Sequence, residues 1–450
     1  MIQELTLKNF KSFGGPPLPP ESGAVPREWA GEKIKFGGLS LLIGTNASGK
    51  SNIRDALRFI HGISRGYTLA EVMGEKYVES GVLQWKGIRG GVREIVTRNG
   101  QPENTKFTIV IRTQLLPEDG GGEAKYSLTV DAGDKHRPPL VAEESLKLSK
   151  NDHETFACRF GTLSRIEIPG FGSLQPGSLR VDRTFLTQIA ELKRDLNQAV
   201  AMLLPTGHEA YSEITAISEA AVDCQAFLRT ISSMRFLDLD TESLRRSSIP
   251  GQTTLGDKGE NLASVLQAIC KDPSGKEALI AWTRELTPLD VTDLKFPEVS
   301  LDGKIQLQLV EQGGREISAE SASDGTLRFL AVAGAMLGTD PARFYFFEEM
   351  ENGIHPNRAH LLINLLRDST SRGAIQVVGT THSPALLNFL DAQTLKDTSL
   401  IYRAGAVSKI RSFADIPSLS QVLPDNLPGE LFGSGWFEDV VSFVEPGGAK

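Results

Sequence analysis

The stretch "GTNASGKS", residues 44 to 51, decides the fold of this chain. It matches the pattern G-x-x-x-x-G-K-[ST] in full, follows the apolar run "LSLLIG", and opens "KSNIRDALRFIHGI", whose apolar residues have helical spacing. In such a strand–loop–helix unit, Gly44 and Gly49 let the backbone curl so that its N–H groups face phosphate oxygens. Lys50 is expected to bridge the β- and γ-phosphates, and the Ser51 hydroxyl to ligate magnesium. The sequence therefore predicts a nucleoside triphosphate site formed by Gly44, Thr45, Asn46, Ala47, Ser48, Gly49, Lys50 and Ser51.

A second stretch, "FYFFEEMENGIHP" at residues 344 to 356, joins an aromatic run to paired acids. The aromatic run predicts a strand of a sheet that is covered by helices on both faces. At the end of that strand, we expect Glu348 to support the magnesium shell and Glu349 to polarise the attacking water. The chain thus carries the two acidic groups that hydrolysis of a nucleotide needs.

Two further segments carry weaker signals. In "ESASDGTLRFLAV", Ser323 is expected to cap a helix, and Gly325 permits a close backbone approach. In "VVGTTHSPALLNFL", an apolar strand ends at His382. Taken alone, the first is more typical of an ordinary helix cap and the second of a structural histidine.

The pattern of elements predicts an α/β fold with a mixed sheet. Between residues 81 and 170, "VREIVTRNG", "KFTIVIRT", "KYSLTVD" and "SRIEIPG" predict antiparallel strands. Residues 183 to 235 predict a short helical hairpin, and the alternation of helix and strand after residue 290 predicts a parallel α/β sheet. We therefore expect an N-terminal lobe with an antiparallel β subdomain at 1–180, a helical insertion at 181–260 and a C-terminal lobe at 261–450.

Composition excludes several classes of protein. A net charge of -8 argues against a generally basic surface that would coat nucleic acid. The three cysteines have no CxxC spacing, so neither a zinc site nor a disulfide framework is expected. The N-terminus does not resemble a signal peptide, and no apolar run is long enough to span a membrane. We expect a cytoplasmic protein without membrane contacts.

Taken together and in this order, the segments resemble the ABC-type ATPase heads of the SMC and RecF class. More narrowly, the chain resembles the compact RecF-like bacterial ATPases related to the ATPase domain of the OLD nuclease. "LTLKNFKSF" resembles the first strand of that class, and "GTNASGKSN" its Walker A motif, including Asn52. "SASDGTLRFL" resembles the signature motif, "EEMENGIHP" the Walker B motif and D-loop, and "THSP" the switch-histidine motif. "WKGIRGG" and "LGDKGENLASVL" resemble further family segments.

The resemblance implies that two heads sandwich two ATP molecules, each held between the Walker A motif of one copy and the signature motif of the other. It implies ATP and Mg²⁺ as cofactors and an ATP-dependent homodimer or higher oligomer. Carried onto this chain residue by residue, it implies a signature in trans at Ser323, Asp324 and Gly325, a D-loop at Asn352, Gly353 and His355, a γ-phosphate sensor at His382, a nucleotide contact from Lys11, and a contact of Gln84 with magnesium and the attacking water.

Three positions depart from the family pattern. Glu348 replaces the usual Asp, Met350 stands where Pro is frequent, and His355 occupies a position that is Asp in transporters. None of these changes removes a group that the chemistry needs, so we still expect slow, Mg-dependent ATP hydrolysis.

The biological role stays open between three hypotheses. The first is a sensor or scaffold in bacterial antiviral defence that acts with a separately encoded nuclease or toxin, because the stretch after His382 is too short for the TOPRIM nuclease domain of OLD-type enzymes. The second is a DNA-binding repair or recombination clamp of RecF type. The third is an ATP-switched structural assembly.

Overall fold

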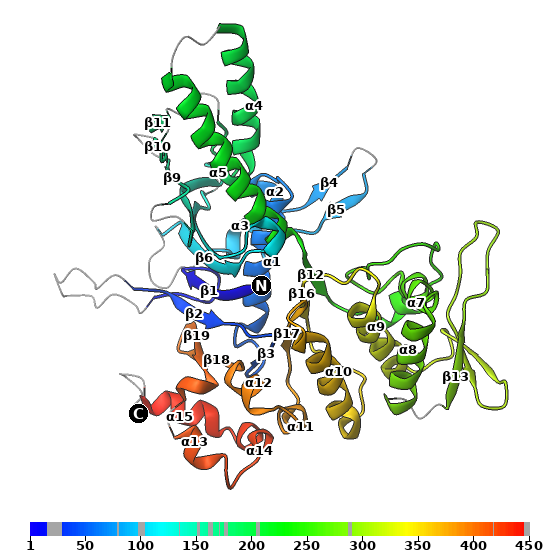
Figure 1. Cartoon of the computed structure of the whole chain (residues 1–450). Helices are drawn as coiled ribbons and strands as arrows, with labels where there is room; N and C mark the ends of the chain where they lie inside the picture. Colours follow the sequence, from blue (N-terminus) through cyan, green and yellow to red (C-terminus); the bar gives the residue numbers. More distant parts are fainter. Residues whose placement is uncertain are drawn as a thin grey trace. The chain divides into compact units, whose positions relative to one another are not determined.

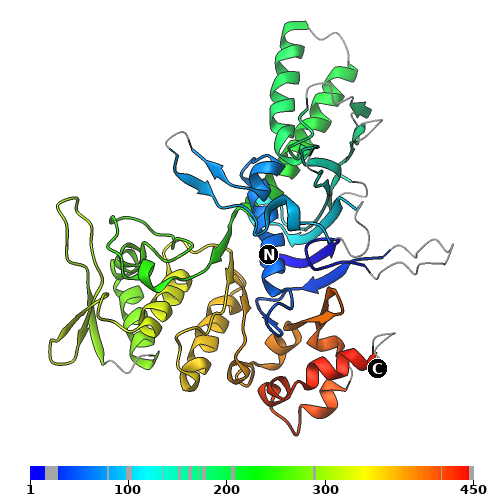
Figure 2. The same ribbon diagram turned by 180° about the vertical axis from the view of Figure 1, so that it is seen from behind.

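The chain divides into two compact units in the computed structural model (Figures 1 and 2). The first unit contains Met1–Lys35, Asn46–Ser233 and Ile401–Ile410, and the second contains Phe36–Thr45, Met234–Leu400 and Arg411–Lys450. The boundaries predicted at residues 180 and 260 stay a prediction. The structure describes residues 1–15, 29–78, 81–97, 104–134, 136–150, 154–160, 165–170, 172–174, 179–203, 208–286, 290–416 and 418–444. Within these ranges, none of the helices has both the length and the apolar composition that crossing a membrane requires.

The first unit is built on an antiparallel sheet with the strand order β11-β10-β9-β8-β7-β6-β1-β2. Along β6, every second side chain is buried, including Phe107, Ile109 and Ile111. This period of two places one face of the strand on the core, and it confirms the predicted antiparallel β subdomain. The strands are β1 (Ile2–Lys8), β2 (Glu32–Lys35), β6 (Lys106–Gln114), β7 (Glu123–Asp131), β8 (Leu140–Leu148), β9 (Phe156–Arg159), β10 (Arg165–Ile168) and β11 (Gly172–Leu174).

One predicted strand of this unit is wrong. The start of "VREIVTRNG" forms a short helix, α3 (Gly91–Glu94), because Gly90 and Gly91 have φ values of 77° and 53° and turn the chain sharply. Ile95 and Val96 are buried, and Val96 makes only an isolated bridge with Phe10. The apolar pair therefore serves packing, and residues 98–100 of the predicted strand lie outside the described residues.

Helix α1 (Lys50–Ser64) covers the sheet of the first unit. The ring of Phe59 on α1 meets the ring of Phe107 on β6 edge to face, with centroids 5.5 Å apart. Two residues further along α1, Nδ1 of His61 lies 3.2 Å from the carbonyl oxygen of Ile231 on α5 (His208–Ser232). The C-terminal half of α1 is thus fixed against both the sheet and α5.

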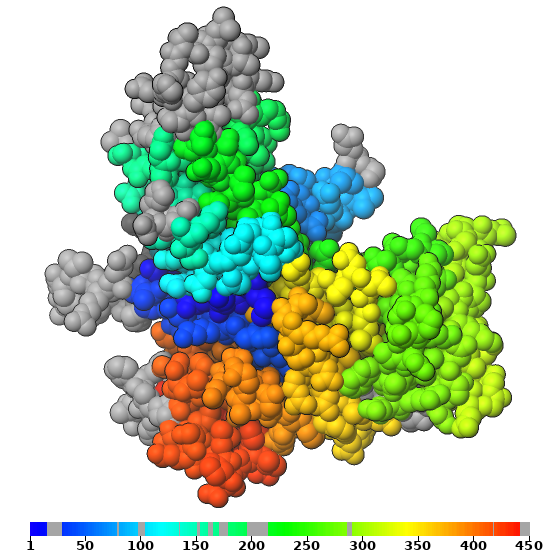
Figure 3. Space-filling model, in the orientation of Figure 1, coloured from blue at the N-terminus to red at the C-terminus, as the bar shows by residue number. Residues whose placement is uncertain are grey.

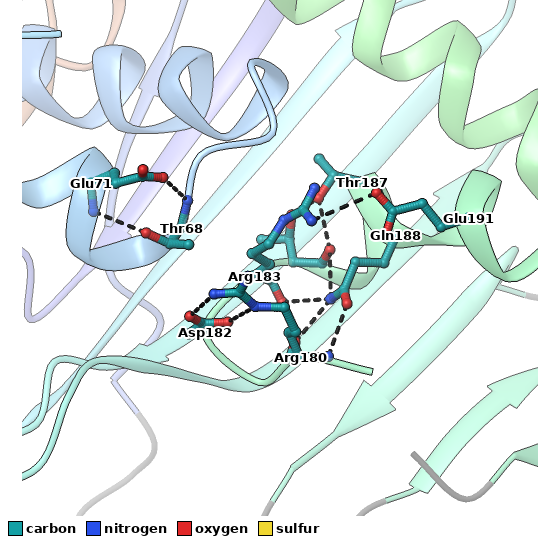
Figure 4. Close-up of polar contacts among 9 residues, drawn as sticks. Thr68, Glu71, Arg180, Asp182, Arg183, Thr187, Gln188 and Glu191 are labelled. Atoms are coloured by element: carbon teal, nitrogen blue, oxygen red, sulfur yellow. Dashed lines mark hydrogen bonds and ion pairs between the residues drawn. The ribbon is translucent and has the colours of Figure 1, made fainter. Parts of the chain in front are cut away.

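Helices α4 (Phe185–Leu203) and α5 form the predicted hairpin, which is confirmed. Figure 4 shows the segment that leads into it: Nε2 of Gln188 donates to the carbonyl oxygens of Arg180 (2.9 Å) and Arg183 (3.1 Å). Nearby, Thr68 and Glu71 form a capping box at the start of α2 (Leu69–Met73), and the N–H of Leu69 donates to the carbonyl oxygen of Asp182. These bonds anchor the base of the hairpin to α2. This unit also contains a two-stranded ribbon of β4 (Lys76–Tyr77) and β5 (Leu83–Trp85), and a 3₁₀ turn at Pro117–Asp119 between β6 and β7.

A buried carboxylate lies below the first turn of α4. Glu144 on β8 accepts hydrogen bonds from the N–H groups of Phe185 (2.6 Å) and Leu186 (3.0 Å) and from the hydroxyl of Tyr126 (2.9 Å). Burial nevertheless raises the pKa of Glu144 to about 7, against the opposing effect of these three donors.

The second unit contains the predicted parallel sheet, with the strand order β12-β16-β17-β3-β18-β19. β12, β16, β17 and β3 pair in parallel, and every residue of β16, β17 and β3 is buried. The prediction of buried apolar strands is confirmed, because residues that point to both faces of these strands are buried. The strands are β3 (Leu39–Ile43), β12 (Met234–Leu237), β16 (Phe344–Phe347), β17 (Gln376–Thr380), β18 (Ser399–Ala404) and β19 (Val407–Ser412).

The helices of the second unit pack beside this sheet. Helices α9 and α10 lie side by side in both ribbon views (Figures 1 and 2). Figure 3 shows α7, α8 and the three-stranded sheet β13-β14-β15 as one continuous mass in green and yellow-green. The elements are α6 (Thr241–Leu244), α7 (Leu262–Cys270), α8 (Pro273–Leu286), β13 (Val291–Lys295), β14 (Gln308–Glu311), β15 (Glu316–Ser318), α9 (Asp324–Leu337), α10 (Ala359–Ser371), α11 (Pro384–Leu387), α12 (Ala392–Lys396), α13 (Leu419–Val422), α14 (Pro428–Gly433) and α15 (Trp436–Val444), with 3₁₀ turns at Pro356–Arg358 and Phe413–Asp415.

Candidate functional site

Three strands of the second unit end at the same edge of its sheet. β3, β17 and β16 run parallel, with Leu42 paired to Thr380 and Gly379 paired to Phe347. The N–H of Thr381 also donates to the carbonyl oxygen of Leu42 at 3.2 Å. The segments that follow these strands therefore begin side by side: the predicted phosphate-binding loop after β3, the paired acids after β16, and the predicted switch histidine after β17. Such a carboxyl edge of a parallel sheet is the usual position of a ligand site in α/β proteins.

The loop between β3 and α1 has the backbone shape that its glycines predict. Gly44 and Gly49 have φ values of 143° and 116°, and Ala47 takes φ 61°, which is uncommon for a residue with a Cβ atom. Thr45, Asn46 and Ala47 are exposed, whereas Ser48 is buried.

Within the first unit, Gly49 is the N-cap of α1 and makes no side-chain cap. Lys50, the first residue of this helix, is 6% exposed, and Ser51 is half-buried. The first turn of α1 therefore offers backbone N–H groups and a positive helix end to an anion.

A cluster of hydroxyl groups supports this loop from behind, and the sequence did not predict it. The hydroxyl of Ser408 on β19 donates to the carbonyl oxygen of Ser48 (2.5 Å), and its Oγ atom also lies 2.7 Å from Oγ of Ser12. Asn52 in turn donates from Nδ2 to Oγ of Ser12 at 2.7 Å. A Cβ atom on Gly49 would lie 2.7 Å from Oγ of Ser408, so only glycine fits there. The hydrogen bond from Asn52 to Ser12 joins the first turn of α1 to this hydroxyl cluster. The predicted contact of Asn52 with nucleotide stays a prediction.

Lys11 lies in the turn after β1, beside α1, with φ 51°. Its ammonium group pairs with the carboxylate of Asp55 on α1 and donates to the carbonyl oxygen of Arg89 at 2.7 Å. The guanidinium of Arg89 pairs with the same carboxylate at 3.3 Å. Lys11 thus ties the first strand to the helix that carries Lys50, and the predicted contact of Lys11 with nucleotide stays a prediction.

Gln84 is an exposed residue of β5, in the two-stranded ribbon of the first unit. Its neighbour Trp85 is buried and donates from Nε1 to the carbonyl oxygen of Val72 at 3.0 Å, which anchors the ribbon. The predicted role of Gln84 at the magnesium ion stays a prediction.

The paired acids after β16 are held differently from one another. The half-buried Glu348 donates its N–H to the carbonyl oxygen of Leu237 at 3.2 Å. Glu349 is exposed and has φ 46°, so the chain turns sharply at this residue. Its N–H donates to Oγ1 of Thr380 (2.9 Å), and its carboxylate accepts from the side-chain amide of Asn352. A left-handed conformation at a residue with a Cβ atom costs about 1–2 kcal/mol, and such costs are frequent at functional sites.

Met350, which departs from the family pattern, has a packing role. It is 5% exposed, and a Cβ atom on Gly379 of β17 would lie 2.2 Å from its terminal methyl carbon. The Met side chain thus fills the space above a glycine of the neighbouring strand.

The signature segment starts α9 as predicted. Oγ of Ser323 accepts a hydrogen bond from the N–H of Thr326 at 3.2 Å, which confirms the N-cap. The close backbone approach predicted at Gly325 is also confirmed, since a Cβ atom there would lie 2.1 Å from the carbonyl oxygen of Gly353. The structure therefore brings the signature segment and the D-loop together, around a cavity of about 100 Å³ that is lined by Ser323, Gly325, Thr326, Phe329, Gly353, Ile354, His355 and Arg358.

The D-loop and the switch histidine are connected by a carboxylate whose role the sequence did not predict. Oε1 of Glu351 accepts from the backbone N–H of His382 at 2.8 Å. His382 is half-buried, and His355 is exposed and caps the 3₁₀ turn that follows it, accepting from the N–H of Asn357. The third acid of "EEMENG" was a weak signal for this contact, because its partner is distant in the sequence.

Comparisons with known proteins identify the family of the chain. A protein-family model described as "AAA domain, putative AbiEii toxin, Type IV TA system" matches residues 39–100 and 208–388, more than half of the 450 residues. No curated protein sequence matches the chain.

Similar solved structures include heads of SMC proteins. The SMC head domain with a coiled coil and joint derived from Pyrococcus yayanosii is 11% identical, with 97% of this chain and 99% of that chain covered and a TM-score of 0.46. The SMC head bound to the C-winged helix domain of ScpA is 15% identical, with 91% and 97% covered and a TM-score of 0.45. The SMC head domain from Thermotoga maritima is 13% identical, with 91% and 98% covered and a TM-score of 0.39. On the strength of the family match, which confirms the resemblance to compact bacterial AAA-type ATPases, this chain belongs to the AAA-domain family that the model describes.

Proposed function

We propose that this chain binds and hydrolyses ATP and that two copies close around the nucleotide. One observation carries the proposal. Because β3, β16 and β17 pair in parallel, the predicted phosphate loop, the paired acids and His382 all follow strands that end at one edge of the sheet. Family membership supports it, because the family is defined by an AAA domain.

Each group has a role in this proposal. The N–H groups of the loop and of the first turn of α1 bind the phosphates, and Lys50 neutralises their charge. Glu349 accepts the proton of the attacking water, and its turned backbone, fixed by Thr380, sets the direction of the carboxylate. His382 senses the γ-phosphate from the end of β17, with its backbone held by Glu351.

The residues proposed for magnesium fit that ion chemically. Ser51 offers a hydroxyl and Glu348 a carboxylate, and Mg²⁺ prefers such hard oxygen ligands together with substrate phosphates and water. When bound, the ion would neutralise charge that develops on the phosphate oxygens. Glu348 would hold the ion from the end of β16, with one more methylene than the Asp that the family pattern has at this position.

The second copy is proposed to complete each site in trans. Ser323 and Asp324 are exposed at the start of α9, and a cavity of about 600 Å³ borders the same segment. An exposed helix start with backbone N–H groups suits the γ-phosphate of a nucleotide bound by another copy.

Nucleotide binding and phosphate release by the purified full chain test this proposal. Lys50→Ala should abolish binding of ATP, whereas Lys35→Ala, a change at an exposed lysine of β2, should leave it unchanged. Full ATPase activity in Lys50→Ala would refute the proposed function.

We propose further that the ATPase acts as a sensor or scaffold for a separately encoded toxin or nuclease. The family description, which names a toxin–antitoxin system, supports this role, and the net charge of -8 argues against unaided coating of DNA. We expect the purified chain to retain the protein encoded by a neighbouring gene when ATP is present and DNA is absent. ATP-enhanced, salt-dependent affinity for duplex DNA would instead favour the RecF-type clamp.

A further inference from the structure

Arg245, at the C-terminal end of α6, binds the segment Glu320–Gly325, which we call the signature loop. Its Nη2 donates to Oδ1 of Asp324 (2.6 Å) and to the carbonyl oxygen of Ala322 (3.0 Å), and its Nε donates to the carbonyl oxygen of Glu320 (3.4 Å). Ser323 lies between two residues that share one nitrogen of this guanidinium. Arg245 therefore holds the chain on both sides of Ser323, whose own hydroxyl caps α9 by accepting from the N–H of Thr326.

The support of Arg245 is itself rigid. Asp240 caps α6 by accepting from the N–H (3.0 Å) and the hydroxyl (2.7 Å) of Ser243, and these bonds hold the pKa of Asp240 below its usual value. Leu244 is 1% exposed, and a Cβ atom on Gly259 would lie 2.3 Å from its Cδ2. Arg245 also donates from Nη1 back to the carbonyl oxygen of Thr241 at 3.3 Å.

The same segment reaches the paired acids. α6 follows β12, and the carbonyl oxygen of Leu237 at the end of β12 accepts from the N–H of Glu348. Residues 237 to 245 therefore contact the residue before Glu349 at one end and the signature loop at the other.

The geometry of Arg245 matters more than its charge. The carboxylate of Asp324 is 59% exposed, so solvent screens its ion pair with Arg245. The side chain of Arg245 is 21% exposed, and its planar fork donates to three acceptors of the signature loop and to one in α6, which the ammonium group of a lysine does not reproduce. The loop also borders the cavity of about 600 Å³, whose lining includes Arg315, Ser318 and Ser321. Arg245 therefore holds a loop that lines a cavity.

We propose that Arg245 is a positioning residue that presents Ser323 and Gly325 to the nucleotide of a second copy. The inference rests on the proposed function, and it assigns to a residue outside the recognised motifs the task of ordering the trans half of the site.

The experiment compares Arg245→Ala, Arg245→Lys and the control Arg246→Ala, a change at the next, exposed residue. ATP affinity of the single chain, turnover against chain concentration, and ATP-dependent dimerisation in a Glu349→Gln background are measured. We expect Arg245→Ala to keep its ATP affinity within about twofold and to lose roughly tenfold in turnover, the cost of about one misplaced transition-state contact. Arg245→Lys should resemble Arg245→Ala, and Arg246→Ala should match the wild type. Unchanged turnover and dimerisation in Arg245→Ala would overturn the inference.

A measurement without nucleotide separates this inference from the proposed function. Amide hydrogen exchange of residues 319–327 in the full chain should be faster in Arg245→Ala than in the wild type and in Arg246→Ala. Equal exchange in all three proteins refutes the positioning role, even for a chain that does not hydrolyse ATP. Faster exchange in Arg245→Ala, together with a wild type that does not hydrolyse ATP, supports the positioning role of Arg245 and refutes the proposed ATPase function.

Discussion

The backbone N–H of Glu349 donates a hydrogen bond to the side-chain hydroxyl of Thr380 at 2.9 Å. The bond joins the end of β16 to the end of β17, and the carbonyl oxygen of Thr380 accepts from the next N–H, that of Met350. The proposed general base is thus oriented by the strand that also carries the switch histidine.

Replacing Thr380 by valine removes the hydroxyl that accepts from the N–H of Glu349 and nearly keeps the shape of the side chain. We expect turnover to fall about tenfold, because a carboxylate whose backbone is no longer fixed spends less time aimed at the attacking water. ATP affinity should stay unchanged. Phosphate release at saturating ATP is the measurement.

The matched control is Thr283→Val, at another buried threonine of the second unit. Its hydroxyl donates to the carbonyl oxygen of Leu279 within α8. If both variants lose turnover equally, the Thr380 bond has no special role in orienting Glu349.

Glu349→Gln should separate binding from hydrolysis. The amide cannot accept the proton of the attacking water, so turnover should fall by about 10²–10⁴-fold, the range usual for loss of a general base. Binding of ATP should persist, and the ATP-bound dimer should live longer. Sedimentation with ATP provides the readout, and hydrolysis at the wild-type rate would exclude Glu349 as the base.

Gly325→Ala tests the contact between the signature segment and the D-loop. The added Cβ atom would lie 2.1 Å from the carbonyl oxygen of Gly353, so one of the two backbones must shift, at a cost of about 1–3 kcal/mol. We expect a lower free energy of unfolding in urea and a loss of turnover.

Gly433→Ala is the control for that change. The nearest atom to a Cβ there is Cγ of Pro384, 4.0 Å away, and the residue ends helix α14. This variant should match the wild type in both measurements. A Gly325→Ala chain as stable as Gly433→Ala would contradict the close contact.

Glu144 predicts a pH dependence of stability. Burial raises its folded pKa to about 7, above the value of 4.5 that applies to the unfolded chain. Between these values the folded chain binds more protons than the unfolded chain, so the contribution of Glu144 is greatest below pH 4.5 and declines until about pH 7. The full decline is roughly 3 kcal/mol.

Urea unfolding at several pH values between 5 and 8 measures this effect. The decline in the free energy of unfolding should be shallower in Glu144→Gln than in the wild type. Glu143→Gln, at the exposed neighbouring residue on β8, should keep the wild-type slope. Identical slopes in all three proteins would show that Glu144 titrates normally.

The sequence predicted those parts of the site that are coded locally. The phosphate loop, the buried strand before Glu348 and the cap at Ser323 each depend on neighbouring residues, and the structure shows each of these local features. The segment at Gly91–Glu94 was predicted wrongly, since two glycines with positive φ overrode a β-like composition.

The supporting contacts could not be predicted in this way. Ser12 and Ser408 meet across 396 positions of the chain, and Arg245 reaches Asp324 across 79. A single serine or arginine carries no local pattern, so only the folded chain shows which partner it has.

A mixing experiment tests the central claim most directly. Lys50→Ala and Ser323→Arg are each expected to be inactive alone, one in the Walker A half and the other in the signature half of the site. In a mixture, half of the dimers are mixed and contain one intact site of two, so activity should recover to about a quarter of the wild-type value. A mixture as inactive as its two components, beside a wild type that is active as a monomer, would contradict the account.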